Sequence, residues 1–124
     1  IATDHAPHAR FEKEQPFGLA PFGIVGLETA LGCVLQWNAD RGEPLSPLEL
    51  IARLSTRPAQ TLGLPAGTLR TGAPADVVVI DPEVRWQVDP TQFRSMGKNS
   101  PFTGWTLRGK ARYTFIGGVK VSGE

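Results

Sequence analysis

The first half of the chain has the hydrophobic spacing of helices. Apolar residues recur at intervals of three, four and seven over 24–37, which places them on one helix face, and the Asp-Arg-Gly of 40–42 ends the run. The apolar residues of this face are Ile24, Leu27, Leu31, Val34 and Leu35. A second helix is predicted over 46–54, because Ser-Pro-Leu-Glu at 46–49 provides a capping serine, a proline suited to the first turn and the glutamate of a capping box. A third, short helix is predicted over 58–63.

The second half of the chain changes to the pattern of strands. Residues 76–81 form an apolar, mostly β-branched run between aspartates, which is typical of a buried strand. Alternating apolar residues over 84–88 predict a strand with one covered face. Residues 90–104 are rich in turn formers, and residues 113–121 predict a β-hairpin with Gly-Gly at its turn. The change of period near residue 65 therefore separates an α-rich part from a β-rich part.

Residues 5–22 follow neither period. Prolines, a glycine and charged residues interrupt every apolar repeat, so a long loop is predicted, and loops of this length are usually functional. The chain opens on Ile1, and residues 1–3 have the character of an apolar strand end. A strand end, a long loop and a helix fit one β/α unit of a barrel, in which active-site groups gather at the carboxyl ends of the strands. The opening within an apparent strand predicts a fragment or a cleaved product of a longer protein.

Composition narrows the class of protein. The 124 residues suffice for one ordinary domain. The chain has 13 basic and 12 acidic residues, so no electrostatic footprint for nucleic acid or an anionic membrane is present, and no run of about 18 apolar residues would cross a membrane. The single cysteine, Cys33, excludes an internal disulfide and predicts a reducing, cytoplasmic compartment. Cys33 and the three tryptophans, Trp37, Trp86 and Trp105, are expected to fill cores.

The long loop begins with a cluster of potential metal ligands. Asp4, His5 and His8 lie within five positions, and carboxylate oxygen and imidazole nitrogen are the ligands that a catalytic zinc prefers. A carboxylate beside a metal can also accept the proton of an attacking water and return it to a leaving group. On residue types alone an alternative remains open. An Asp-His pair after a strand is often a local turn in which the aspartate hydrogen-bonds to the backbone.

Longer segments resemble one known family. Thr-Asp-His-Ala-Pro-His at 3–8, Glu-Lys at 12–13 and the segment 20–28 look like the last barrel strand and loop of dihydroorotases of the long-chain bacterial type, in the amidohydrolase superfamily. Later segments are similar to the small β-sandwich domain of that superfamily, at residues 67–69, 72–81, 99–102 and 117–118. The first match is specific to dihydroorotases, whereas the second marks only the superfamily.

The resemblance implies an α/β fold class, namely the C-terminal portion of a metal-dependent (β/α)8 TIM-barrel hydrolase with a small β-sandwich domain. Residues 1–64 would form the last β/α unit of the barrel and the helices that follow it, and residues 65–124 the β-sandwich segment. The implied activity is the zinc-dependent, reversible cyclisation of N-carbamoyl-L-aspartate to dihydroorotate in pyrimidine biosynthesis. One or two zinc ions are implied, with the other ligands outside this chain.

The resemblance also assigns roles to individual residues. Asp4 matches the aspartate that ligates the metal centre and shuttles the proton. His8 matches a histidine that contacts the substrate carboxylate, and Phe22 and Gly23 match positions whose backbone holds the same carboxylate. For His5, a supporting hydrogen bond and a substrate contact both stay open. The alternatives are that His8 only braces the loop and that Phe22 and Gly23 only form the turn into the helix.

Other features of the family have no counterpart in this chain. Histidine occurs only at positions 5 and 8, and there is no His-x-His motif. A catalytic zinc needs about three protein ligands, so the chain alone is expected to be inactive. The helix over 24–37 would expose an apolar stripe that needs a partner. The charged residues at 10–14 are expected to be a solvated loop face, or part of a loop that closes over substrate.

Two further functions stay open. Another cyclic amidohydrolase, such as an allantoinase or dihydropyrimidinase, would share the motifs of the superfamily, but His8 suits a substrate that bears a carboxylate. A non-catalytic dihydroorotase homologue would instead be a structural partner of aspartate carbamoyltransferase, and Asp4 and His8 argue against it. The expected partners are the small-molecule substrate and the N-terminal part of the parent protein, with a homodimer or aspartate carbamoyltransferase as further options, and no nucleic acid or membrane.

Overall fold

The helix predicted over 24–37 begins later than its apolar spacing indicated. In the computed structural model, which describes residues 1–123, helix α2 spans Ala30–Asp40. The residues before it are drawn into tertiary contacts. Ile24 pairs with His5 in a parallel bridge, and Val25 donates its backbone N–H to the carbonyl of Asn99. The apolar residues at the start of the run therefore belong to an extended segment, and the predicted helix start was wrong.

The second and third predicted helices join into one helical stretch. Helix α3 (Pro47–Ile51), the π-helical turn η1 (Ala52–Thr56) and helix α4 (Arg57–Thr61) follow one another without a break. The capping box is confirmed, because the Ser46 hydroxyl accepts from the Glu49 N–H while the Glu49 carboxylate accepts from the Ser46 N–H. Pro58 has no N–H to donate to a carbonyl of the preceding helical turn, and that preceding turn is the wider π-helical turn η1.

The strands form one antiparallel sheet in the order β1-β2-β3. Strand β1 spans Val77–Gln87, β2 spans Thr106–Ile116 and β3 spans Val119–Ser122. The two strands predicted over 76–81 and 84–88 are one strand whose register shifts between Asp81 and Arg85. The Gly-Gly hairpin between β2 and β3 is confirmed, and a short 3₁₀ helix, η2 (Pro90–Gln92), lies in the turn-rich connection.

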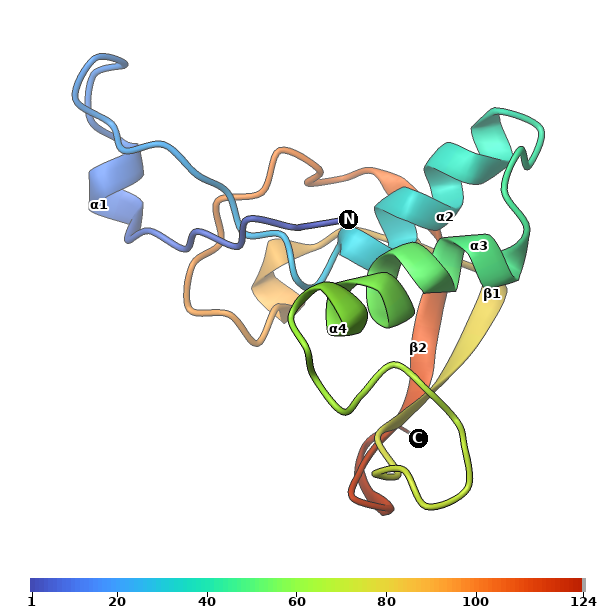
Figure 1. Ribbon diagram of the computed structural model, residues 1–124. Coiled ribbons are helices and arrows are strands. Elements are labelled where there is room, and N and C mark those ends of the chain that lie inside the picture. The colour runs from blue at the N-terminus through green and yellow to red at the C-terminus, as the bar shows by residue number, and fades with distance from the viewer. Residues whose placement is uncertain (124) are drawn as a thin grey trace.

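The β-sandwich expected over 65–124 is not confirmed. Residues 1–123 contain a single three-stranded sheet, and α2 packs on β2 (Figure 1). The strand over 76–81, which was predicted to be buried, is partly exposed, since Val78 and Val79 are 48% and 44% exposed. A β-branched run indicates a strand, but which of its faces is covered depends on what packs against it.

The core draws on both halves of the chain. Val25 from the first half packs with Val88, Phe93 and Leu107 from the second. Gly32 permits the close approach of α2 to the sheet, because a Cβ at this position would stand 3.1 Å from the Leu107 side chain. The division into 1–64 and 65–124 stays a prediction, although these two segments share this core.

The predictions for cysteine and tryptophan had mixed outcomes. Cys33 and Trp86 are partly buried and pack against the core, as expected, and burial raises the pKa of the Cys33 thiol. Trp37 and Trp105 are 43% and 56% exposed, so the expectation that they fill cores was wrong. Both rings have other partners. Arg41 stacks over Trp37, and Phe102 meets Trp105 edge to face.

The predicted loop over 5–22 projects from the rest of the molecule (Figure 1). It contains one short helix that the sequence did not indicate, α1 (Arg10–Lys13), whose first turn is held by the Glu12 carboxylate accepting from the Ala9 N–H. The loop meets the helices and sheet at the segments around His5 and Gly23, where the candidate site lies.

No helix among the described residues has the length and apolar character to cross a membrane.

Candidate active site

Asp4 stands at the entrance to the loop with an unusual backbone. Its φ is 45°, in the left-handed region that aspartate tolerates better than most residues. The residue is exposed, and within residues 1–123 its carboxylate has no hydrogen-bond or ion-pair partner. The local turn in which this aspartate would bond to the backbone is therefore not formed. The carboxylate is free to take an external ligand.

The described residues do not by themselves form a metal centre. Within 1–123, no group of three or more His, Cys, Asp or Glu side chains is placed to hold an ion. Asp4, the carboxylate that the resemblance marks as a ligand, is exposed and has no partner within these residues. A catalytic zinc needs about three protein ligands, so the remaining donors would have to come from outside this chain.

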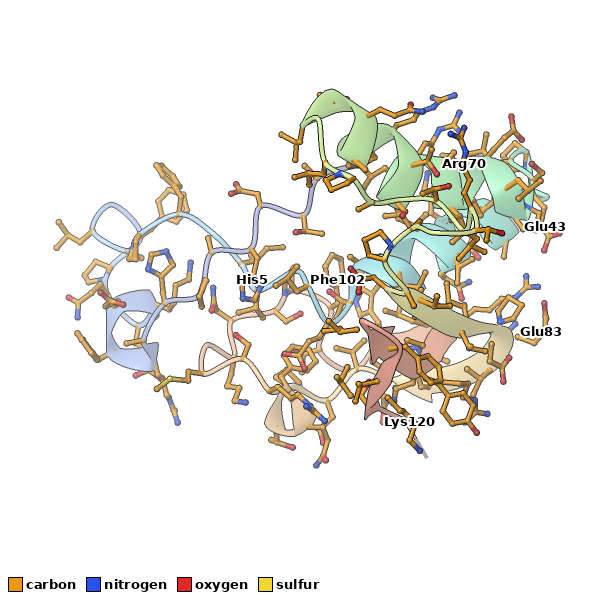
Figure 2. The ribbon with its side chains drawn as sticks, turned by 60° about the horizontal axis from the view of Figure 1, so that its bottom comes forward. His5, Glu43, Arg70, Glu83, Phe102 and Lys120 are labelled. Carbon is orange, nitrogen blue, oxygen red and sulfur yellow. The ribbon has the colours of Figure 1, made fainter. Side chains whose placement is uncertain are left out.

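His5 fastens the loop to the segment that leads into α2. Its Nδ1 accepts hydrogen bonds from the backbone N–H groups of Gly26 at 3.1 Å and Leu27 at 3.3 Å. An imidazole nitrogen that accepts carries no proton, so the neutral ring holds its proton on Nε2. His5 lies at the junction between the projecting loop and the helices (Figure 2). Of the two roles left open for His5, this structure shows the supporting hydrogen bond.

His8 and Gly23 lie together in the structure. A Cβ on Gly23 would stand 3.4 Å from His8 Nε2, so the imidazole borders the backbone of this glycine. His8 Nδ1 faces the Glu12 carboxylate at 3.8 Å. The imidazole therefore has one nitrogen toward the glutamate and the other toward the Phe22–Gly23 turn.

The backbone N–H groups of the Phe22–Gly23 turn have no internal hydrogen-bond partner among the described residues. Neither N–H of this pair donates to another backbone or side-chain group within residues 1–123. Phe22 is 97% exposed. Gly23 has φ 112°, which favours glycine. An unpaired Gly23 N–H next to the His8 imidazole would suit an anion.

Sequence reasoning gave no site role to Asn99, which links the parts of this turn. Its side-chain Oδ1 accepts from the His8 N–H at 3.5 Å, and its Nδ2 donates to the Gly23 carbonyl at 2.9 Å. Its own carbonyl accepts from the Val25 N–H. The only signal was the place of Asn99 in a segment similar to the superfamily, because no local pattern indicates a contact so far along the chain.

Lys13 was also missed. It was expected to belong to a solvated loop face, yet its ammonium donates to the carbonyls of Pro21 at 2.9 Å and Gly23 at 3.1 Å. For Lys13 that expectation was wrong, because the turn of α1 directs the side chain back across the loop. Arg10 fits the expectation, since it pairs with Glu14 on the surface. That pairing raises the pKa of the Arg10 guanidinium.

Sequence comparison places the chain among known proteins. The model of the Amidohydrolase family matches residues 1–121. The chain belongs to the amidohydrolase family. The residues matched to this family include the segment of Asp4 and the long loop.

Relatives of this amidohydrolase chain have consistent names. A protein named dihydroorotase from Syntrophus aciditrophicus is 51% identical over 124 residues, which are 100% of this chain and 29% of that protein. Another protein of this name, from Pelotomaculum thermopropionicum, is 48% identical over 121 residues, or 98% of this chain and 28% of that protein. The resemblance to dihydroorotases is confirmed. The chain spans less than a third of the length of these relatives.

Solved amidohydrolase structures share the fold. An L-hydantoinase (dihydropyrimidinase) from Arthrobacter aurescens superposes with a TM-score of 0.78 at 35% identity, over 86% of this chain and 24% of that one. A dihydropyrimidinase from Brevibacillus agri gives a TM-score of 0.86 at 24% identity, over 97% of this chain and 27% of that one. At that identity the second likeness concerns the fold alone.

Proposed function

We propose that this chain works as the C-terminal part of a dihydroorotase, a zinc-dependent hydrolase with a (β/α)8 barrel. The observation that carries the proposal is the meeting of His8 with Gly23, whose N–H is unpaired within residues 1–123, in the same loop region that follows the free carboxylate of Asp4. An anion site at His8 and Gly23, combined with Asp4 as a metal ligand, would suit a cyclic amide that bears a carboxylate of its own. Relatives named dihydroorotase at 48–51% identity support the same substrate class.

Asp4 would be the zinc ligand contributed by this chain. Bound zinc would polarise the ring carbonyl and lower the pKa of the attacking water. Asp4 would accept the proton of that water and then donate it to the departing amide nitrogen, which opens the ring to N-carbamoyl-L-aspartate. In the biosynthetic direction the same steps would run backwards: the Asp4 carboxylate would accept the proton of the attacking nitrogen and return it to the oxygen that leaves as water. Within residues 1–123 no hydrogen bond occupies this carboxylate, so its oxygens are open to a water or a leaving group.

His8, Phe22 and Gly23 would hold the substrate carboxylate. The imidazole can donate from Nε2, and the two backbone N–H groups donate from the adjacent turn. Several donors on one carboxylate fix its orientation as well as its position. Binding of the carboxylate would therefore set the distance between the scissile amide and Asp4, which is the proximity contribution to catalysis.

The proposed setting is pyrimidine biosynthesis in the cytoplasm. The partners would be the small-molecule substrate, the rest of the parent polypeptide, and either a second copy or aspartate carbamoyltransferase. A structural homologue without activity is less favoured, because this chain has Asp4 as well as His8 and Gly23, the residues of the proposed carboxylate site. A hydantoinase or dihydropyrimidinase activity is also less favoured, since the solved L-hydantoinase is 35% identical, below the relatives named dihydroorotase.

The proposal is tested on the complete enzyme that carries this chain. Metal analysis and hydrolysis of dihydroorotate should show bound zinc and turnover, and a chelator should remove both together. Hydantoin and 5,6-dihydrouracil, which lack the ring carboxylate, serve as comparison substrates. Zinc-free protein without turnover would contradict the proposal, and so would a preference for the two rings that lack the carboxylate.

A further inference from the structure

Two side chains from distant parts of the chain converge on the carbonyl oxygen of Gly23. Lys13 Nζ donates to it at 3.1 Å and Asn99 Nδ2 donates at 2.9 Å. Lys13 comes from α1 in the projecting loop, whereas Asn99 comes from the connection that follows η2. A carbonyl oxygen has two lone pairs, so these two donors satisfy it fully.

This double contact matters because the turn would otherwise be loosely defined. Glycine moves among more backbone conformations than any other residue, and Gly23 is held at φ 112°. Fixing the Gly23 carbonyl limits rotation of the main chain on which the free N–H groups lie. The donor from Lys13 is charged, and hydrogen bonds from charged groups are stronger than those between neutral groups.

Asn99 also reaches the other half of the carboxylate site. Its Oδ1 accepts from the His8 N–H at 3.5 Å while its Nδ2 holds Gly23. One amide therefore connects the backbone of the histidine with the backbone of the glycine. Its partners lie on two separate segments of the loop, so the spacing between them depends on this side chain and on Lys13.

We propose that Lys13 and Asn99 are positioning residues that hold His8 and the Phe22–Gly23 turn at the spacing required by the substrate carboxylate. This inference rests on the proposed function of the same site. Neither side chain needs to touch the substrate. Their effect is to pre-form the donor arrangement, which lowers the cost of ordering the turn when substrate binds.

The expected kinetic signature is a change in KM. If the two residues only pre-form a binding site, their loss weakens ground-state and transition-state binding alike, so KM rises and kcat stays nearly constant. Lys13→Met and Asn99→Ala in the complete enzyme should each raise KM for dihydroorotate about tenfold, the scale of one hydrogen bond that involves a charged or fixed group. The double variant should raise KM by less than the product of the two factors, because both donors serve one oxygen.

Matched variants separate this role from general damage. Arg10→Met removes a positive charge from the same short helix, where Arg10 contacts only exposed Glu14, and Gln92→Ala removes an amide from η2. Both controls should leave KM unchanged. Lys13 is partly exposed, so Lys13→Met carries the test even where Asn99→Ala disturbs folding.

The outcomes are distinct. A raised KM with constant kcat and a melting temperature equal to that of the controls supports the positioning role. An unchanged KM, or a fall in kcat together with the melting temperature, overturns it. Absence of dihydroorotate turnover in the wild-type enzyme would overturn the proposed function and this inference together, whereas normal wild-type turnover with unaffected variants overturns the inference alone.

Discussion

The backbone of Gly23 lies against the side chain of Ala6. A Cβ added to Gly23 would stand 2.5 Å from the Cβ of Ala6, closer than two carbon atoms can approach without movement of the backbone. This contact brings the turn next to the loop that carries His8. The absence of a side chain at position 23 is therefore part of how the candidate carboxylate site is built.

Replacement of Gly23 should weaken substrate binding. In the complete enzyme, Gly23→Ala would force the turn away from Ala6 and strain a φ of 112°, so we expect KM for dihydroorotate to rise at least tenfold. Steady-state kinetics measure the change. Gly18→Ala is the matched control, because a Cβ at Gly18 would meet no atom within 4 Å. Equal KM values for the two variants would show that the close packing at position 23 has no role in binding.

Gly109 should be sensitive to substitution for a steric reason. It has φ 86° and its Cβ position is occupied by Leu35 of α2, whereas Gly72 has φ 85° and open space around it. Gly109→Ala should therefore lower the free energy of unfolding by about 1–3 kcal/mol more than Gly72→Ala does, the scale of an overpacked core. Denaturant unfolding of the two variants measures this difference. The same loss of stability in both would mean that α2 does not pack closely on β2.

The capping box at the start of α3 should make stability depend on acid. Hydrogen bonds from the Ser46 N–H and hydroxyl lower the pKa of the Glu49 carboxyl below its usual value. A lowered folded-state pKa means that the stabilisation is present above the unfolded pKa of about 4.3 and is lost as the pH falls through the folded value. The melting-temperature difference between the wild type and Glu49→Ala should be largest near neutral pH and shrink below pH about 4. A difference that stays constant over this range would contradict the assignment.

Local signals in the sequence were sufficient for elements whose causes are local. The capping box at Ser46 and the Gly-Gly turn before β3 depend on neighbouring residues, and both formed as predicted. The start of α2 could not be found in this way. Ile24 has helical spacing, but its bridge to His5 and the burial of the adjacent Val25 in a core with Leu107 keep this segment extended. Trp37 has the same limitation, since its exposure depends on what covers its face of α2.

The residues of the candidate site show the same division between local and long-range causes. Asp4, His8 and Gly23 were identified from contiguous motifs, and the structure brings the last two together. Lys13 and Asn99 were not, because a lysine among charged residues and an asparagine in a turn have no local mark of their function. Their partner is a backbone carbonyl, and carbonyl positions depend on the folded loop.

The role of Asp4 is the central claim, and substitution by asparagine tests it most directly. Asp4→Asn keeps the size of the side chain and removes the group that accepts and returns the proton. Dihydroorotate turnover of the complete enzyme should fall below detection while the melting temperature stays near that of the wild type, because Asp4 is exposed. Asp40→Asn, at the exposed end of α2, is the control and should retain full turnover. Turnover near the wild-type rate in Asp4→Asn would contradict the account.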